Sequence, residues 1–335
     1  MKYNMEYKKK IPFRRNIEDS HVSSLSRAFS YLFDSSITNN DIKKIVSLIN
    51  KIEKKMVGRL AGDIEDYILN YYMHYYAALR LKSYAVPCHL EIGTLFGGST
   101  IITLFALREA KSVQKVISVD PLDGYYLANK KSYSNSIDII TGLPLDKETV
   151  EKNISLFGFN KNSFKILPFL SSDIRAQQKL KKYSILSLFI DGDHSYKGIE
   201  NDWNNYTPSV VEMGFILVDN YNDISWPDVT EFINHQVLPD YRHWAVIYVT
   251  NKSILFQRCI GSAAQSELVY SLSQSIMNYS NSIKKLEKEM KKTNIIIKKK
   301  NLIIKEKDEI VDYMQNSISW RLTGPLRRLR RLFRT

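Results

Sequence analysis

Residues 89–100 have the sequence HLEIGTLFGGST and decide the fold. A short apolar strand reaches Glu91, a glycine turn follows at Gly93 and Gly97, and a helix is expected to open at Ser99. Glycine lets the backbone approach a ligand closely, and the first N–H groups of a helix have no partner within the helix. The stretch therefore predicts a strand–turn–helix unit with a ligand beside the turn.

The next strand, KVISVDP, ends in Asp120. The turn does not match the dinucleotide fingerprint G-x-G-x-x-G, because Leu95 stands where the second glycine belongs. An acid before the first glycine suits a ligand without phosphates, and the acid after the next strand suits a ribose diol. An ordinary strand–turn–helix in an α/β domain, with no ligand, is the alternative interpretation.

Two further strands are expected to end in acidic residues. SILSLFIDGDHSY (184–196) reaches Asp191, and GFILVDN (214–220) reaches Asp219 and Asn220. Ligands of open parallel sheets bind beyond the carboxyl ends of the strands, so these side chains should converge. Three oxygen ligands suit Mg²⁺. The alternative is that the two aspartates only cap the following helices.

These motifs together resemble the class I S-adenosylmethionine-dependent methyltransferases, and more narrowly the metal-dependent sugar and small-molecule O-methyltransferases. The resemblance covers about 86–260 and implies an α/β, Rossmann-like sheet that is mostly parallel with an antiparallel last strand. It implies that Glu91 contacts the methionine end, that Asp120 holds the ribose and that Ser172 and Asp173 flank the adenine. The cofactor-binding residues expected are Glu91, Gly93, Thr94, Gly97, Ser99, Asp120, Ser172 and Asp173.

The same resemblance implies a metal held by Asp191, Asp219 and Asn220. The chain departs from the sugar-modifying members at Asn220, where they usually carry a second Asp, so the site should bind metal more weakly. A sugar hydroxyl is a poor nucleophile and needs a base or a metal to remove or polarise its proton. His194 and Asp193 are the expected bases. For His194, a loop histidine with ordinary partners is the alternative.

Hydrophobic spacing and turn residues organise the rest of the chain. The helical pattern of Ile42, Ile45, Ile49 and Ile52 and an aromatic-rich stretch over 67–84 predict a helical N-terminal region, in which the tyrosines pack rather than bind ligand. A polar excursion within 121–162 is expected to form a lid or acceptor loop. Further elements are expected as helices near 146–158, at 197–206 and at 227–238, strands at 164–169, 184–190 and 214–219, and a hairpin of 242–249 with 253–259.

Composition limits the class of protein. The 44% hydrophobic content of the 335 residues supports a full core. Cys88 and Cys259 fall in expected strands and are interpreted as buried reduced thiols, which favours the cytosol. His89 is expected to be a packed core residue. The N-terminal stretch lacks the apolar core of a signal peptide, and no run approaches 18 apolar residues, so no membrane-spanning helix is expected.

The C-terminal part has a different pattern. Apolar residues recur in heptads over 265–316, with Ile276, Ile283 and Ile297 at one position and lysines weakening the other. This pattern predicts a parallel two-stranded coiled coil, with a single amphipathic helix as the alternative. Residues 317–335 carry six arginines and no acid, with leucines on one helical face, which is typical of a helix lying on an anionic membrane.

Residues 267–335 contribute +9 of the net charge of +13, so the basic pI belongs to the tail and a nucleic-acid groove on the catalytic domain is not expected. Nucleic acid as a partner of the tail is the less favoured alternative. The tail also resembles those of surface-polysaccharide enzymes. The expected organisation is a basic segment and helical region over 1–85, a methyltransferase domain over 86–260, a coiled coil over 265–316 and a basic tail over 317–335.

The sequence therefore predicts an S-adenosylmethionine-dependent O-methyltransferase of sugar or glycan hydroxyls in cell-surface polysaccharide biosynthesis. We expect it to be cytoplasmic and peripheral on the inner face of the cytoplasmic membrane, a homodimer through the coiled coil, and a neighbour of glycosyltransferases. A catalytically silent scaffold at the membrane and a hydroxylase-like enzyme on the same fold are the alternatives.

Overall fold

The computed structural model describes residues 17–33, 35–122, 138, 140–259, 289–290, 292–293 and 295–309. Seven strands form one sheet with the order β3-β2-β1-β4-β5-β7-β6. The strands are β1 Pro87–Ile92, β2 Lys115–Val119, β3 Phe164–Leu167, β4 Ser184–Ile190, β5 Val210–Val218, β6 Trp244–Val249 and β7 Ile254–Arg258. Strands β1 to β5 pair in parallel, and β7 pairs antiparallel with both β5 and β6. The predicted mostly parallel sheet with an antiparallel end is confirmed.

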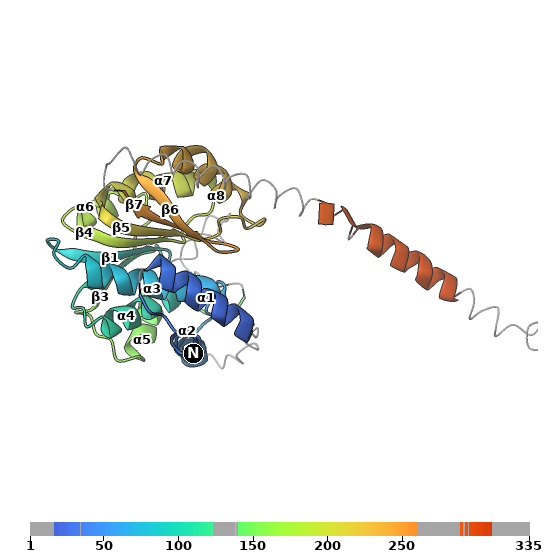
Figure 1. Ribbon diagram of the computed structural model, residues 1–335, viewed down its shortest axis with the longest axis horizontal. Coiled ribbons are helices and arrows are strands. Elements are labelled where there is room, and N and C mark those ends of the chain that lie inside the picture. Colours follow the sequence, from blue (N-terminus) through green and yellow to red (C-terminus); the bar gives the residue numbers. More distant parts are fainter. Residues whose placement is uncertain are drawn as a thin grey trace, which may run out of the picture. The chain divides into compact units, whose positions relative to one another are not determined.

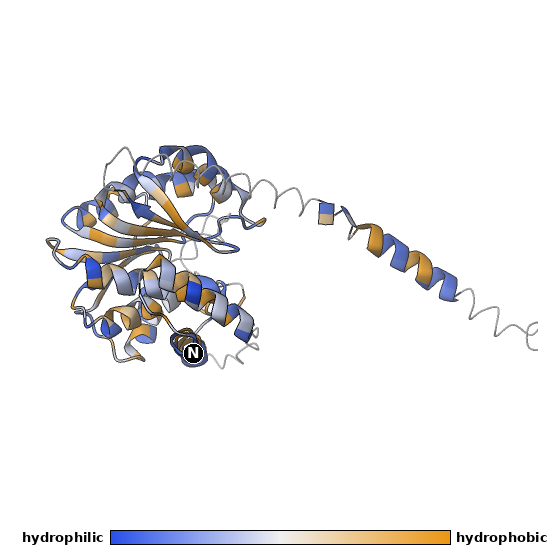
Figure 2. Cartoon of the chain, in the orientation of Figure 1, coloured by the Kyte–Doolittle hydropathy of each residue, from blue (hydrophilic) through white to orange (hydrophobic). Residues whose placement is uncertain are grey.

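Helices cover both faces of this sheet (Figure 1). One face packs against α1 Asp19–Leu32, α2 Asn39–Lys55, α3 Ile64–Arg80, α4 Gly98–Glu109 and α5 Lys147–Ser155. The other face packs against α6 Ile174–Leu180, α7 Tyr196–Tyr206 and α8 Pro227–Phe232, which continues through Ile233–Val237 and Leu238–Asp240. Because both faces are covered, the parallel strands are rich in apolar residues, and Figure 2 shows orange segments along them.

The N-terminal helices share one core with the sheet. In α2 the four predicted isoleucines are buried, and Thr38 with Asp41 forms a capping box that fixes where the helix begins. The tyrosines of α3 are packing residues, as expected: Tyr72 and Tyr76 are buried, and the ring of Tyr76 stacks on that of Phe33 with centroids 4.7 Å apart. The helical region is therefore part of the body that carries the sheet.

Most helix and strand boundaries lie within a few residues of those predicted from the sequence, and β4 has both of its predicted ends. Strand β3 ends at Leu167, two residues earlier than expected, because Pro168 cannot donate a ladder hydrogen bond. Strand β5 begins at Val210, four residues earlier than expected. Helix α6 was not predicted. Asp173 caps it by accepting from the backbone N–H of Arg175.

Two histidines lie in the core between α3, β1 and β4. The ring nitrogens Nδ1 of His74 and His89 each lie 2.6 Å from the hydroxyl of Ser187. Burial lowers the pKa of His89 to about 4, so its ring is neutral at physiological pH. His89 is a packed core residue, as predicted. Cys88 is buried, whereas Cys259 is only half-buried, so the expectation of a buried thiol is wrong for Cys259.

The described C-terminal residues belong to a second unit, 278–335. Residues 295–309 form a helix whose apolar side chains recur every seven residues, as the bands in Figure 2 show. Ile297 and Ile304, on the predicted heptad position, are 48% and 55% exposed, so this single chain leaves the apolar stripe uncovered. The rest of the coiled-coil segment and the tail 317–335 lie outside the described residues, as do the basic residues 8–15.

No described helix has both the length and the apolar character required to cross a bilayer.

Candidate active site

The glycine turn after β1 is fixed by contacts with the protein itself. Gly93 and Gly97 have φ angles of +84° and +87°, which only glycine adopts easily. A Cβ atom on Gly93 would lie 1.9 Å from the carbonyl oxygen of Asp191, and one on Gly98 would lie 2.1 Å from Leu60. Packing thus already explains why these positions are glycine, and contact of Gly93 and Gly97 with a cofactor stays a prediction.

Glu91 lies in β1 directly below this turn and is buried. Its carboxylate accepts hydrogen bonds from the hydroxyls of Ser99, Thr100 and Ser118. Burial raises the pKa of Glu91 to about 7, although these hydroxyl bonds work in the opposite direction. The predicted residues Glu91 and Ser99 therefore contact each other, and a contact of Glu91 with the methionine end stays a prediction.

Asp120 follows β2 and holds the turn in place. Its Oδ2 accepts from the backbone N–H groups of Thr94 (2.7 Å) and Leu95 (3.1 Å), and its Oδ1 accepts from that of Leu122 (2.8 Å). The predicted pair of Thr94 and Asp120 is thus brought together at the carboxyl ends of β1 and β2. This is the place where the resemblance puts the ribose, and that role stays a prediction.

Ser172 and Asp173 follow β3, the next strand along the same edge. Ser172 is exposed and Asp173 is the N-cap of α6, with its Oδ1 2.8 Å from the backbone nitrogen of Arg175. Both residues therefore lie beside Asp120's strand, and their contact with adenine is untested.

The acidic strand ends of β4 and β5 are adjacent. The backbone N–H of Asp191 donates to Ile92 of β1, and that of Asp219 donates to Ile190 of β4. Neither aspartate caps a helix, because the N-cap of α7 is Ser195 and that of α8 is Trp226. The capping interpretation is therefore wrong.

Asp219 has a raised pKa, and the side-chain oxygen of Asn220 lacks a hydrogen-bond partner among the described residues. Burial and the neighbouring carboxylates of Asp191 and Asp66 raise the pKa of Asp219 well above its ordinary value. Asn220 has a φ of +61°, and its buried Oδ1 has no hydrogen-bond partner among the described residues. Buried polar atoms are nearly always paired in native proteins, so this oxygen is available to a ligand.

The two predicted bases lie in the loop after β4. His194 Nε2 is 3.2 Å from Asp191 Oδ1, so the imidazole is oriented by a carboxylate. The ring of Trp226 lies against His194, with centroids 4.6 Å apart. Asp193 Oδ1 instead accepts from the backbone N–H of Ser195. The structure therefore brings His194 together with Asp191, and the role of His194 or Asp193 as the base stays a prediction beside the loop-histidine alternative.

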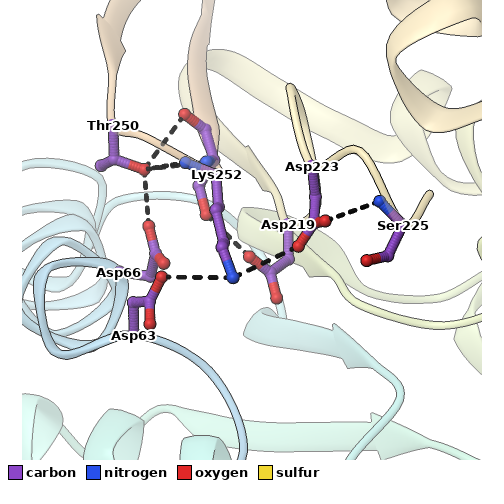
Figure 3. Close-up of polar contacts among 8 residues, drawn as sticks. Asp63, Asp66, Asp219, Asp223, Ser225, Thr250 and Lys252 are labelled. Carbon is purple, nitrogen blue, oxygen red and sulfur yellow. Dashed lines mark hydrogen bonds and ion pairs between the residues drawn. The ribbon is translucent and has the colours of Figure 1, made fainter. Parts of the chain in front are cut away.

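The turn between β6 and β7 reaches the same edge and was not predicted to take part (Figure 3). Ser253 Oγ donates to Asp219 Oδ1 (2.8 Å), and Thr250 Oγ1 donates to Asp66 Oδ1 at the start of α3 (2.6 Å). Lys252 Nζ lies 3.3 Å from Asp223 and 3.6 Å from Asp63. The turn thus ties the N-terminal helices to the loop that follows β5. The signal in the sequence was the polar T-N-K-S turn (250–253) that joins the two strands of the predicted hairpin.

A cavity of about 340 Å³ opens beside this turn and the start of α3. Its lining includes four acids, Glu18, Asp63, Glu65 and Asp66. Burial raises the pKa of Asp66 to about 6, and the hydroxyl of Thr250 opposes that rise. The cavity therefore has a negative lining that disfavours anionic ligands.

No group of three or more His, Cys, Asp or Glu side chains in the described part of the chain has the arrangement of a metal site. The predicted set contains two such residues and the amide of Asn220.

Comparisons with known proteins support this description. A family model described as a methyltransferase domain matches residues 90–221, which include the glycine turn, Asp120, Asp191 and Asp219. An uncharacterized protein of Acanthamoeba polyphaga mimivirus is 30% identical over 155 residues, which are 44% of this chain and 57% of that protein. The match therefore spans little more than half the length of that relative.

Two solved structures are similar at low identity. The O-methyltransferase NovP is 15% identical, with 72% of this chain and 100% of that chain covered and a TM-score of 0.49. CalS11, a TDP-rhamnose 3'-O-methyltransferase in calicheamicin biosynthesis, is 13% identical, with 72% and 96% covered and a TM-score of 0.42.

The strand order, the glycine turn joined to Asp120 and the matched family model agree with one another. Residues 90–221 are therefore similar to a methyltransferase domain.

Proposed function

We propose that this methyltransferase transfers the methyl group of S-adenosylmethionine to a hydroxyl of a sugar or a growing glycan. The observation that carries the proposal is the contact between His194 and Asp191, 3.2 Å apart, at the edge that also holds the glycine turn. A carboxylate-oriented imidazole is suited to removing the proton of an alcohol, which is a weak nucleophile until it is deprotonated.

The residues around the turn fit the cofactor. Asp120 fixes the backbone of Thr94 and Leu95, so the upper surface of the turn is rigid before any ligand binds. S-adenosylmethionine supplies the electrophilic methyl group when it is bound. Asp120 would hold the ribose, Glu91 and the turn would support the methionine end, and Ser172 and Asp173 would flank the adenine.

On the acceptor side, His194 holds and moves the proton. If Nε2 carries the ring proton and donates it to Asp191, Nδ1 has the free lone pair that accepts the proton of the acceptor hydroxyl. Asp191 then stabilises the imidazolium that forms, as a carboxylate beside a cation does. Asp193 is the less favoured base, because its Oδ1 already accepts from Ser195.

The residues present also fit a divalent cation. Asn220 Oδ1 is buried and unpartnered among the described residues, and Asp191 and Asp219 raise each other's energy when both are charged. Carboxylate and amide oxygens are the donors that Mg²⁺ prefers. Asp191, Asp219 and Asn220 would hold the ion, which would polarise an acceptor hydroxyl.

The charge of the acidic cavity favours neutral acceptors over anionic ones. Glu18, Asp63, Glu65 and Asp66 repel free phosphate and nucleotide groups, whereas sugar hydroxyls can donate hydrogen bonds to carboxylates. We propose that this cavity receives part of the acceptor, and a neutral sugar or glycan would then fit it better than an anionic acceptor.

The remaining parts of the proposal concern location and partners. The exposed apolar stripe of 295–309 suits pairing with a second copy, and the arginine-rich segment 317–335 suits the anionic inner face of the cytoplasmic membrane, close to glycosyltransferases of surface-polysaccharide assembly. Flotation with anionic vesicles tests this. Full-length protein should float, protein lacking 317–335 should not, and retention of nucleic acid by protein that never floats would favour the other partner.

Methyl transfer from labelled S-adenosylmethionine to a panel of methyl glycosides tests the main proposal, with the product located by mass spectrometry. We expect one glycoside class to be methylated on oxygen, with a rate at least 100-fold lower in His194→Gln. Methylation of catechols but of no glycoside would contradict the assignment of a sugar acceptor. An unchanged rate of methyl transfer in the presence of chelator would contradict the proposed metal site.

A further inference from the structure

An exposed tryptophan stands beside the expected base. Trp226 is 43% exposed, and its ring lies 4.6 Å from that of His194 at an interplanar angle of 59°. His194 in turn contacts Asp191. An indole left in water at the edge of a site is unusual, because burying so large an apolar surface would stabilise the fold. Trp226 therefore offers an apolar surface within reach of the reacting groups.

The backbone around Trp226 is held before any ligand binds. Its N–H donates to the carbonyl of Asp223 (3.0 Å), and Pro227 follows it with a restricted φ. Asp228, the second residue of α8, accepts from the backbone N–H of Tyr196 at the start of α7 (3.0 Å). This bond joins the two helix starts that follow Trp226 and His194 in the chain.

The groups in contact with Trp226 are polar. The imidazole of His194 lies against the indole and is itself bonded to the carboxylate of Asp191, and the carbonyl of Asp223 accepts from the backbone N–H of Trp226. A pyranose ring has the complementary surface: one face of C–H groups, which packs on the electron-rich face of an aromatic ring, and a rim of hydroxyls that donate to carboxylates. A flat apolar surface surrounded by hydrogen-bond acceptors is therefore what a sugar requires.

We infer that Trp226 is the platform on which the acceptor sugar ring stacks, with one of its hydroxyls presented to His194. This inference rests on the proposed function and adds to it a residue that selects the acceptor. Trp226 binds the sugar and takes no part in proton transfer.

Steady-state kinetics with the methyl glycoside panel test this role. Trp226→Ala should raise the acceptor KM about tenfold, which is the scale of stacking on one aromatic ring, and change kcat much less. Trp226→Phe should recover most of the affinity. Calorimetry should give wild-type S-adenosylmethionine affinity in both variants, which excludes misfolding. Tyr31→Ala is the matched control, because Tyr31 is an aromatic residue 92% exposed on α1.

Tryptophan emission gives a readout independent of turnover. Trp203 and Trp244 are buried, so Trp226 should dominate the response of the described tryptophans to a ligand at the surface. Titration of the methylated glycoside class into enzyme saturated with S-adenosylhomocysteine should change the emission saturably in wild type and not in Trp226→Phe.

The outcomes are distinguishable. A wild-type KM in Trp226→Ala, or an unchanged emission response in Trp226→Phe, would overturn the inference and leave the proposed function intact. Failure of the wild-type enzyme to methylate any glycoside would overturn both.

Discussion

Two neighbouring parts of one sheet edge are built differently. At the ends of β1 and β2, Glu91 and Asp120 are surrounded by hydroxyl and N–H donors from the protein itself. At the ends of β4 and β5, Asp219 has a strongly raised pKa and the Oδ1 atom of Asn220 has no partner among the described residues. The carboxylates of the first half have their hydrogen bonds without a ligand, whereas in the second half the Oδ1 atom of Asn220 still lacks a partner and Asp219 lies beside other carboxylates.

This difference assigns separate tasks to the two halves. A preformed, rigid turn suits a cofactor that binds in the same way in every cycle, because little conformational entropy is lost on binding. At the other half, the buried Oδ1 of Asn220 has no partner among the described residues and can accept a bond from a ligand. We therefore expect the β1–β2 half to control cofactor affinity and the β4–β5 half to control turnover.

The largest effect should come from Gly93, where the two halves touch. Gly93→Ala places a methyl group 1.9 Å from the carbonyl of Asp191 and should destabilise the fold by more than about 4 kcal/mol. Gly142→Ala is the control: φ is +70° there, but nothing lies within 4 Å, so the cost should be about 1 kcal/mol. Urea unfolding measures both, and equal losses would show that the contact between the halves is unimportant.

Ionisation of the buried Glu91, in the β1–β2 half, should make the free energy of unfolding depend on pH. Its folded pKa of about 7 is raised above the ordinary value of 4.5, so the stabilising contribution of Glu91 is complete below the unfolded pKa and is lost as pH rises through the folded pKa. Wild type should therefore lose about 3 kcal/mol more than Glu91→Gln between pH 4.5 and pH 8. Glu148→Gln, at an exposed site on α5, should follow wild type. Parallel curves for wild type and Glu91→Gln would contradict the assigned burial.

Asp120→Ala should leave three backbone N–H groups without their acceptor and weaken S-adenosylmethionine binding by about 1–3 kcal/mol. Asp146→Ala removes the acceptor of one N–H group at the start of α5 and should leave cofactor affinity unchanged. Calorimetry measures the S-adenosylmethionine affinity of both variants and so distinguishes loss of the acceptor at the glycine turn from loss of an ordinary helix cap. Wild-type affinity in Asp120→Ala would refute the ribose assignment.

Lys252→Met should have the smallest effect. Its ion pairs with Asp63 and Asp223 are partly exposed, so stability should fall by less than about 1 kcal/mol. Acceptor kcat/KM should still fall about threefold, because the loop after β5 loses its link to α3. Lys43→Met, which breaks an exposed pair with Asp19, should change neither quantity. Equal kinetics for the two variants would show that the link does not serve the site.

Local patterns predicted the sheet well. Strand β4 is a mainly apolar run, Pro168 follows β3 and a glycine turn follows β1, so the strands and the residues at their carboxyl ends could be found. The sequence could also place Asp191, Asp219 and Asn220 at one edge, because parallel strands align those ends. Period and polarity predict the strands, whereas the arrangement of the sheet came from the resemblance to the methyltransferases.

The residues that complete the site could not be found in this way. Ser253 reaches Asp219 only because β7 returns antiparallel beside β5, and Asp66 reaches Thr250 across 184 residues of sequence. No local pattern in the sequence singles out Trp226, and only the contact of its ring with His194 shows that it lies beside the site. Contacts of this kind depend on the packing of whole elements and leave no local pattern.

Cofactor titration and turnover, measured together on Asp120→Ala and Asp219→Ala, test the division of tasks most directly. Asp219→Ala should bind S-adenosylmethionine within about threefold of wild type and lose at least 100-fold in turnover. Asp120→Ala should bind about tenfold more weakly or worse, yet keep more than a tenth of wild-type turnover at saturating cofactor. Loss of cofactor affinity in Asp219→Ala with retained turnover, or equal losses of both quantities in the two variants, would contradict the assignment of binding and chemistry to separate halves.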